Sequence, residues 1–293
     1  MKNLIWQTKI GDEQFSLQYI KDFLLKGIDY KEIFDGGECK VFLDDSIIVY
    51  SCCNDLPKKL EEYFKKYDEL KYKYYIIHTS NEARNEHDFT HYKNAKHVFR
   101  EYYDPKTDAF DNVTTIPLGY KTGFLNEDRE GLFHANNKEY LWAFIGQVGK
   151  SDRVFMYDHL KTIGPHFVHS TSQWDCPTSL SVEKSIEIYK KTFFVPCPMG
   201  WLNPDSFRIN EALEWGCVPI VKKYPNFDGI NYYKHVYGDN IPFIVVNEWN
   251  ECPKIMMDLC NNVDILNKLM YDIQIWYNIF RKNLQIDFQN KLK

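Results

Sequence analysis

Charged side chains interrupt an otherwise apolar segment, "FFVPCPMGWLNPDSFRINEALEWGCVPIV", which covers residues 193–221. Two apolar runs typical of buried strands enclose a predicted helix that carries Arg208, Glu211 and Glu214. Burying an ionised group is costly unless it has a partner. The segment therefore predicts either a site for a charged ligand or a salt bridge of its own.

The residues around this helix predict its ends and a possible ligand. Asp205 or Ser206 can cap its start, and Gly216 suits the left-handed position that ends it. Arg208 then lies in the first turn, beside the free amides that favour a phosphate. Glu211, one turn later, is placed for ribose hydroxyls. The same spacing also allows an Arg208–Glu211 salt bridge on a solvated face of the helix. Spacing alone does not decide between a nucleotide site and this salt bridge.

A second glycine-containing segment follows a predicted strand in "YLWAFIGQVGKSDR". Gly146 and Gly149 precede Lys150, Ser151 and Arg153, which open a predicted helix. A Walker A loop would need a glycine five residues before the second one, where this chain has phenylalanine. We therefore reject a nucleoside-triphosphatase and expect a cationic helix start that can hold a diphosphate.

Composition restricts the class of protein. The 293 residues are 44% hydrophobic and 26% charged, which is typical of a folded globular chain long enough for two domains. The net charge of -5, without a basic block, argues against a nucleic-acid partner. We see no signal peptide and no bilayer-spanning apolar run, so we expect a cytoplasmic protein without an integral membrane segment.

Apolar periodicity predicts the elements that position these residues. The N-terminal half is expected to hold a hairpin turned at Asp44–Asp45, a helix and three further strands. Their ranges are 40–45 and 46–53 for the hairpin, 56–70 for the helix, and 73–79, 96–103 and 113–120 for the strands. A polar stretch at 126–139 predicts a domain boundary.

Strands and helices alternate after this boundary, which predicts a parallel sheet with right-handed crossovers. We expect strands at 140–146, 192–198 and 217–221, and helices at 151–164, before 191, around Arg208 and at about 263–290.

The order of these motifs resembles the donor domain of the exostosin family of glycosyltransferases. "FIGQ…R…L", "IYKKTFFVPCPMG" and "SFRINEALEWGCVPIV" follow the family's glycine-bearing strand end, Cys-Pro-x-Gly loop, Ser-x-Arg-x-x-[Glu/Asp]-Ala and Gly-Cys-x-Pro-Val-Ile. The similarity covers about residues 140–250. In length the chain resembles the compact exostosin-like enzymes of bacteria and large DNA viruses. If the chain is viral, we expect it in the cytoplasm of the host cell.

The resemblance implies an α/β protein of the GT-B architecture, with two Rossmann-like domains whose parallel sheets face a cleft. The expected domains are an acceptor-side domain at 1–130, a donor-binding domain at 131–270, and a C-terminal helix at 271–293 that packs back on the N-terminal domain. The implied reaction is inverting transfer from a UDP-sugar to a glycan hydroxyl. UDP-xylose is favoured, and UDP-glucuronate and UDP-galactose are possible.

The implied donor site lies in the C-terminal half. Its expected residues are Gly146, Gln147, Lys150, Ser151, Arg153, Pro198, Gly200, Ser206, Arg208, Glu211 and Glu214. We expect no cofactor and no bound metal, because the chain has no Asp-x-Asp pair to hold one on a diphosphate. Cationic side chains and helix dipoles would then stabilise the leaving group, with Glu211 or Glu214 on the ribose.

Inverting transfer needs one general base for the acceptor hydroxyl. "IIHTSNEARNEHDFTH" offers Glu82, our first choice, with His78 and Asp88 behind it. Trp174 and Trp201 lie in loops near the expected donor site and could stack on uracil or sugar.

Two other functions fit the same residues. A GDP-fucose-dependent GT-B transferase would also suit an arginine-containing, metal-free site. A catalytically inactive carbohydrate-binding protein would bind glycans without any nucleotide.

Overall fold

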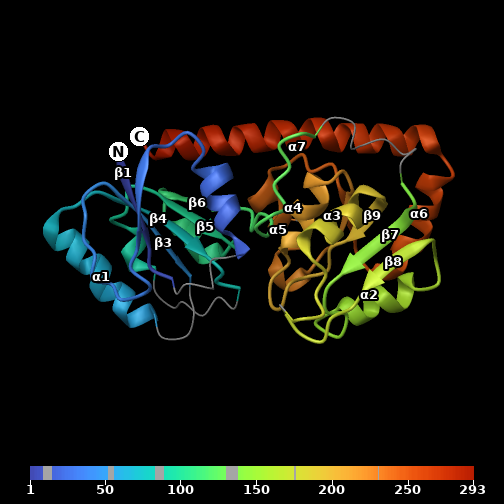
Figure 1. Ribbon diagram of the computed structural model, residues 1–293, viewed down its shortest axis with the longest axis horizontal. Coiled ribbons are helices and arrows are strands. Elements are labelled where there is room, and N and C mark those ends of the chain that lie inside the picture. The colour runs from blue at the N-terminus through green and yellow to red at the C-terminus, as the bar shows by residue number, and fades with distance from the viewer. Residues whose placement is uncertain (9–14, 52–55, 83–88, 130–137, 175, 230) are drawn as a thin grey trace. The chain divides into compact units, whose positions relative to one another are not determined.

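The computed structural model describes residues 1–8, 15–51, 56–82, 89–129, 138–174, 176–229 and 231–293. The chain forms two compact units. Unit 1 comprises Met1–Leu118 with Asn283–Lys293, and unit 2 comprises Gly119–Lys282. Each unit is built on one parallel sheet (Figure 1). We expected a boundary near residue 130, but residues 119–129 belong to unit 2.

Six parallel strands form the sheet of unit 1, in the order β2-β1-β3-β4-β5-β6. The strands are β1 Lys2–Trp6, β2 Tyr30–Phe34, β3 Ser46–Ser51, β4 Tyr74–Thr79, β5 Val98–Glu101 and β6 Val113–Ile116. The helical segments are a π-helix at Tyr19–Leu24, α1 at Leu56–Leu70, and 3-10 turns at Thr90–Tyr92 and Pro105–Ala109.

Helix α1 has the predicted bounds, and its predicted apolar stripe is buried. Leu60, Tyr63, Phe64 and Tyr67 recur every three or four residues and pack into one core cluster under the sheet. The amphipathic pattern was sufficient to predict the bounds and the buried face of α1, because this helix covers the sheet with a single face.

The predicted hairpin at residues 40–53 is wrong. β3 pairs in parallel with β1 and β4, and residues 40–45 form no strand. Asp44 accepts a hydrogen bond from the Lys73 amide (2.6 Å), and Asp45 has a positive φ and an ion pair with Lys2 (2.7 Å). The two aspartates thus start β3 beside its parallel neighbours and do not turn it back on residues 40–45.

Five parallel strands form the sheet of unit 2, in the order β11-β10-β9-β7-β8. The strands are β7 Tyr140–Ile145, β8 His166–His169, β9 Thr192–Pro196, β10 Val218–Lys222 and β11 Ile244–Val246. The helices are α2 Arg153–Leu160, α3 Val182–Lys190, α4 Phe207–Glu214, α5 Asn231–Tyr237, α6 Cys252–Cys260 and α7 Val263–Lys291. Two 3-10 turns lie at Pro225–Phe227 and Trp249–Glu251.

The strand order of unit 2 reverses between β7 and β9. From β7 the chain moves outward through α2 to β8, and from β9 it moves the opposite way through α4 to β10. Right-handed crossovers then place α2 and α4 on opposite faces of the sheet (Figure 1). The carboxyl ends of β7 and β9 form a topological switch point, where open α/β sheets bind ligands.

Strand β8 lies where the sequence analysis predicted no element, and α2 ends at Leu160, before the expected end at Gly164. β8 is a short edge strand with no fully buried residue, so it lacks the apolar run that indicated β7, β9 and β10. The sequence analysis also missed β1, β2 and β11. No helix in the described parts of the chain has the length and apolar character needed to cross a membrane.

Helix α7 belongs to unit 2 through Lys282 and to unit 1 from Asn283 onward. In unit 1, Phe288 stacks on Phe99 of β5 with ring centroids 3.8 Å apart, and Gln285 donates to the Phe23 carbonyl (2.8 Å). The expected return of the C-terminal helix to the N-terminal domain therefore holds for its last turns.

Within unit 2, α7 helps enclose a buried carboxylate, Glu214. This side chain is fully buried and lies 3.2 Å from Arg129 and 3.3 Å from Arg281. Tyr277 donates a further hydrogen bond to it (2.9 Å). Burial raises the pKa of the Glu214 carboxyl, and the two guanidinium groups oppose that shift. With its oxygens occupied, Glu214 is a structural anchor, which corrects its predicted place on a ribose.

We predict that Glu214→Gln lowers the free energy of unfolding of unit 2 by about 3 kcal/mol, because it leaves the buried Arg129 and the half-buried Arg281 without their carboxylate. Urea unfolding followed by tryptophan fluorescence would measure the change. The matched control is Glu187→Gln, which breaks an exposed Lys184–Glu187 pair and should cost less than about 0.5 kcal/mol. Equal costs for the two variants would contradict the anchoring role.

Candidate active site

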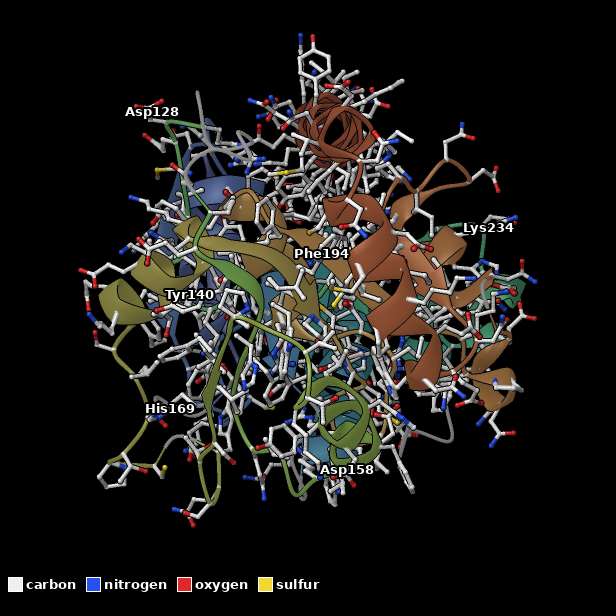
Figure 2. The ribbon with its side chains drawn as sticks, turned by 90° about the vertical axis from the view of Figure 1, so that its right-hand side faces the viewer. Asp128, Tyr140, Asp158, His169, Phe194 and Lys234 are labelled. Carbon is white, nitrogen blue, oxygen red and sulfur yellow. The ribbon has the colours of Figure 1, made fainter. Side chains whose placement is uncertain are left out.

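Two loops meet at the switch point of unit 2, one after β7 (residues 146–152) and one after β9 (residues 197–206). Figure 2 shows these strands through the labelled Tyr140 of β7 and Phe194 of β9, with His169 at the end of β8. The Ser151 hydroxyl donates to the Gly200 carbonyl (2.7 Å), which ties one loop to the other.

Arg153 reinforces this connection. Its guanidinium donates to the carbonyls of Met199 (3.1 Å), Gln147 (3.2 Å) and Gly200 (3.4 Å). Arg153 is buried, and these backbone acceptors occupy its nitrogens. We predicted that Arg153 binds the diphosphate and that Ser151 belongs to the donor site. The structure uses both to hold the two loops in position.

Arg208 lies in the first turn of α4 and is 8% exposed. Its guanidinium sits over the Phe144 ring, 4.5 Å from the centroid, and one terminal nitrogen donates to the Ile145 carbonyl (3.0 Å). Its Nε is buried and has no hydrogen-bond partner. The alternative of a salt bridge on a solvated face is wrong, because residues 208–214 are all buried. Arg208 instead keeps one donor unused beside the end of β7.

Gly146 makes room for this arginine. Its φ is +138°, and a Cβ there would lie 2.9 Å from the terminal nitrogen of Arg208. Cβ atoms essentially never lie this close to another heavy atom, so a side chain at this position would displace the Arg208 guanidinium. The predicted glycine-bearing strand end therefore has a clear physical reason.

Two further buried polar groups precede Arg208. Ser206 occupies the N-cap position, as predicted, but its hydroxyl makes no capping hydrogen bond and has no partner. Asn203 is fully buried, and neither its amide nitrogen nor its amide oxygen has a partner. The other predicted cap, Asp205, accepts from the Tyr237 hydroxyl (3.1 Å). Sequence reasoning missed Asn203, whose only signal was its position before a proline in the loop.

Glu211 lies one turn into α4, close to a lysine and to aromatic side chains. It is buried, and one carboxylate oxygen lies 3.7 Å from the Lys121 ammonium. Lys121 also lies over the Trp174 ring (5.7 Å to the centroid), and Trp174 stacks on Phe207 at the start of α4 (6.2 Å). Lys121 escaped the sequence analysis because 90 residues separate it from Glu211.

The remaining predicted donor residues line the two loops. Lys150 is partly exposed, and its ammonium lies 5.8 Å from the centroid of the Trp201 ring. Trp201 is 60% exposed, whereas Pro198 is buried. The expected tryptophans thus lie in the loop after β9 and against α4.

The three candidate bases have different surroundings. His78 is fully buried and makes polar contacts with Arg100 (2.8 Å) and Tyr50 (3.3 Å). Burial and the nearby Arg100 charge hold the pKa of His78 well below its usual value. A side chain enclosed in this way cannot meet an acceptor hydroxyl, so His78 is a structural residue. Glu82 follows β4 and is partly exposed, and Asp88 lies outside the described residues.

A comparison with protein families decides the classification. The model of the RXYLT1 C-terminal domain matches residues 121–293, more than half of the chain. The chain belongs to this family. The match includes the whole switch-point site, from Gly146 to Glu211. The exostosin resemblance stays a prediction. No curated protein matches the chain.

Several solved structures share the fold of this family member at low sequence identity. The crystal structure of an alpha1,3-fucosyltransferase has a TM-score of 0.58 and 13% identity, covering 100% of this chain and 90% of its own. A glycotransferase of kitacinnamycin has a TM-score of 0.51 and 8% identity, covering 100% and 99%. An alpha-glucosyltransferase in complex with UDP-glucose and DNA containing an abasic site has a TM-score of 0.50 and 10% identity, covering 94% of each chain.

The fold is therefore that of GT-B glycosyltransferases, as the resemblance implied. Family and fold together identify the chain as a glycosyltransferase. Within the described ranges, no three His, Cys, Asp or Glu side chains are grouped so that they could hold a metal ion.

We predict that Gly146→Ala lowers the free energy of unfolding of unit 2 by more than about 1 kcal/mol, because alanine is strained at this φ and collides with Arg208. Gly149→Ala is the matched control in the same loop, where nothing lies within 4 Å of an added Cβ. Urea unfolding of both variants checks the prediction, and similar midpoints would contradict it.

Proposed function

We propose that this family member transfers a sugar from a UDP-sugar to a hydroxyl group of a glycan, inverting the anomeric carbon and needing no bound metal ion. One observation carries the proposal. Arg208 is buried at the start of α4, at the switch point of the donor-side sheet, with an Nε that has no partner. An unused charged donor in such a place suits an anionic ligand.

The diphosphate is proposed to bind at the start of α4. The free amides of the first turn, the Ser206 hydroxyl and the Arg208 Nε are hydrogen-bond donors close together in the chain. Lys150 adds a second positive charge from the loop after β7. These groups would stabilise the charge that develops on the leaving UDP, the role a metal ion has in other transferases.

The nucleoside is proposed to bind further along α4. Glu211 has a buried oxygen without a hydrogen bond, which suits a ribose hydroxyl. Trp174 is exposed on top of Phe207 and can stack on the nucleobase. Lys121 lies close to both, with its ammonium 3.7 Å from a Glu211 oxygen and over the Trp174 ring.

The proposed reaction is a single displacement. The acceptor oxygen attacks the anomeric carbon, the bond from that carbon to the diphosphate oxygen breaks, and UDP leaves with the electron pair. A general base takes the acceptor proton. Glu82 remains our candidate because it is a partly exposed carboxylate three residues after the end of β4.

Xylose remains the favoured sugar, with glucuronate and galactose as possible alternatives. GDP-fucose is a second candidate donor, since one structure with this fold is an alpha1,3-fucosyltransferase. The cytoplasmic location stays a prediction.

The donor site can be tested by thermal shift with UDP, GDP and their sugars, with and without EDTA. A nucleotide present at ~100 times its Kd should stabilise the protein by about 2.7 kcal/mol. We expect a shift with UDP-sugars that EDTA does not change. A shift with GDP alone would favour the fucose donor, and a shift that EDTA abolishes would contradict the metal-free site.

Arg208→Ala should weaken UDP binding about 10- to 100-fold, because it removes a charge-assisted hydrogen bond. Lys184→Ala, which removes an exposed positive charge on α3, should bind UDP as the unmodified protein does. Isothermal titration calorimetry measures both affinities. Full affinity in Arg208→Ala would contradict the diphosphate assignment.

Glu82→Gln should lower kcat about 100-fold or more while the Kd for UDP stays unchanged, since a general base acts on the acceptor and leaves donor binding alone. Glu69→Gln, at an exposed ion pair on α1, is the control and should keep its kcat. An unaffected kcat in Glu82→Gln would assign the base to another residue.

A further inference from the structure

Asn203 is the most unusual polar residue of the site. It is 0% exposed, and both its amide nitrogen and its amide oxygen lack a hydrogen-bond partner. A buried group left in this state costs about 1–3 kcal/mol. Asn210, equally buried in α4, donates to the Tyr237 hydroxyl (2.9 Å). Asn203 therefore has no protein partner for either end of its amide, unlike its neighbour seven residues away.

The position of Asn203 suggests what would satisfy it. It closes a turn with Gly200, whose amide donates to the Asn203 carbonyl (2.8 Å). The Ser206 hydroxyl and the Arg208 Nε, also buried without partners, follow within five residues. Such a group of unused hydrogen-bonding atoms at a switch point is typical of a site that a ligand completes.

The chemistry of an amide narrows the ligand group. Asn203 offers two N–H donors and one acceptor oxygen. Phosphate oxygens accept only, so a phosphate would leave the amide oxygen unsatisfied. A hydroxyl group both donates and accepts, and can pair with each end of the amide. Asn203 precedes the start of α4, and the proposed ribose ligand Glu211 lies one turn after it, so the two can contact different parts of a ligand whose diphosphate binds there.

We propose that Asn203 binds a hydroxyl group of the transferred sugar and so contributes to the choice of donor. This inference rests on the proposed function, because it assumes that the diphosphate binds at the start of α4. Trp201 and Leu202, at the tip of the turn, are already exposed. Residues 203–206 behind them are buried, so the turn has to move for the Asn203 amide to meet the sugar.

Asn203→Ala tests the proposal, with Asn210→Ala as the matched buried control. Thermal unfolding without ligand and calorimetric Kd values for UDP and for UDP-xylose, UDP-galactose and UDP-glucuronate are the readouts. We expect Asn203→Ala to keep or raise the Tm, keep the Kd for UDP, and reduce the affinity for the preferred UDP-sugar relative to UDP about 10-fold. Asn210→Ala should lower the Tm and keep that ratio.

Three results would overturn the inference while the proposed function stands. Asn203→Ala could lower the Tm as much as Asn210→Ala, could keep the ratio of UDP-sugar to UDP affinity, or could weaken both ligands equally. Asn203→Ser, a smaller change, repeats the test if the alanine variant does not fold. An unmodified protein that binds none of these nucleotides would contradict the proposed function itself.

Discussion

The burial of α4 is the constraint on which the rest of unit 2 depends. A helix with residues 208–214 buried can carry charged side chains only where partners reach them. At its carboxyl end, Arg129 and Arg281 neutralise Glu214. At its amino end, Arg208 rests on an aromatic ring and keeps a nitrogen unused. One helix therefore has a structural end and an end suited to a ligand.

The switch point of the sheet determines where that second end can act. β7 and β9 are neighbours in the sheet, but the crossovers that follow them run in opposite directions, which makes their carboxyl ends a topological switch point. Arg153 and Ser151 tie the two loops together through backbone carbonyls. These bonds hold the loop after β9, and with it the start of α4, at the end of β7.

Much of the fold could be predicted from local pattern. The apolar stripe of α1 defined both its bounds and its buried side, and the alternation of strands and helices indicated parallel sheets. Prediction failed where the pattern was weak, as in β8, or where a turn signal such as Asp44–Asp45 had another use. For the site, the pattern placed Arg208 in the first turn of a helix, but it could not say which charges already had partners.

The sequence by itself determined much of the local geometry of this protein, such as the bounds of α1, the helix that carries Arg208, and the glycine that follows β7 with a positive φ. Only the tertiary structure decided which polar groups are satisfied. Glu214 and Arg153 are occupied, whereas Asn203 keeps unused atoms in a buried position. The physical reason is that hydrogen-bond partners come from residues far apart in the chain, as between Arg129 and Glu214, and no local periodicity encodes such pairs.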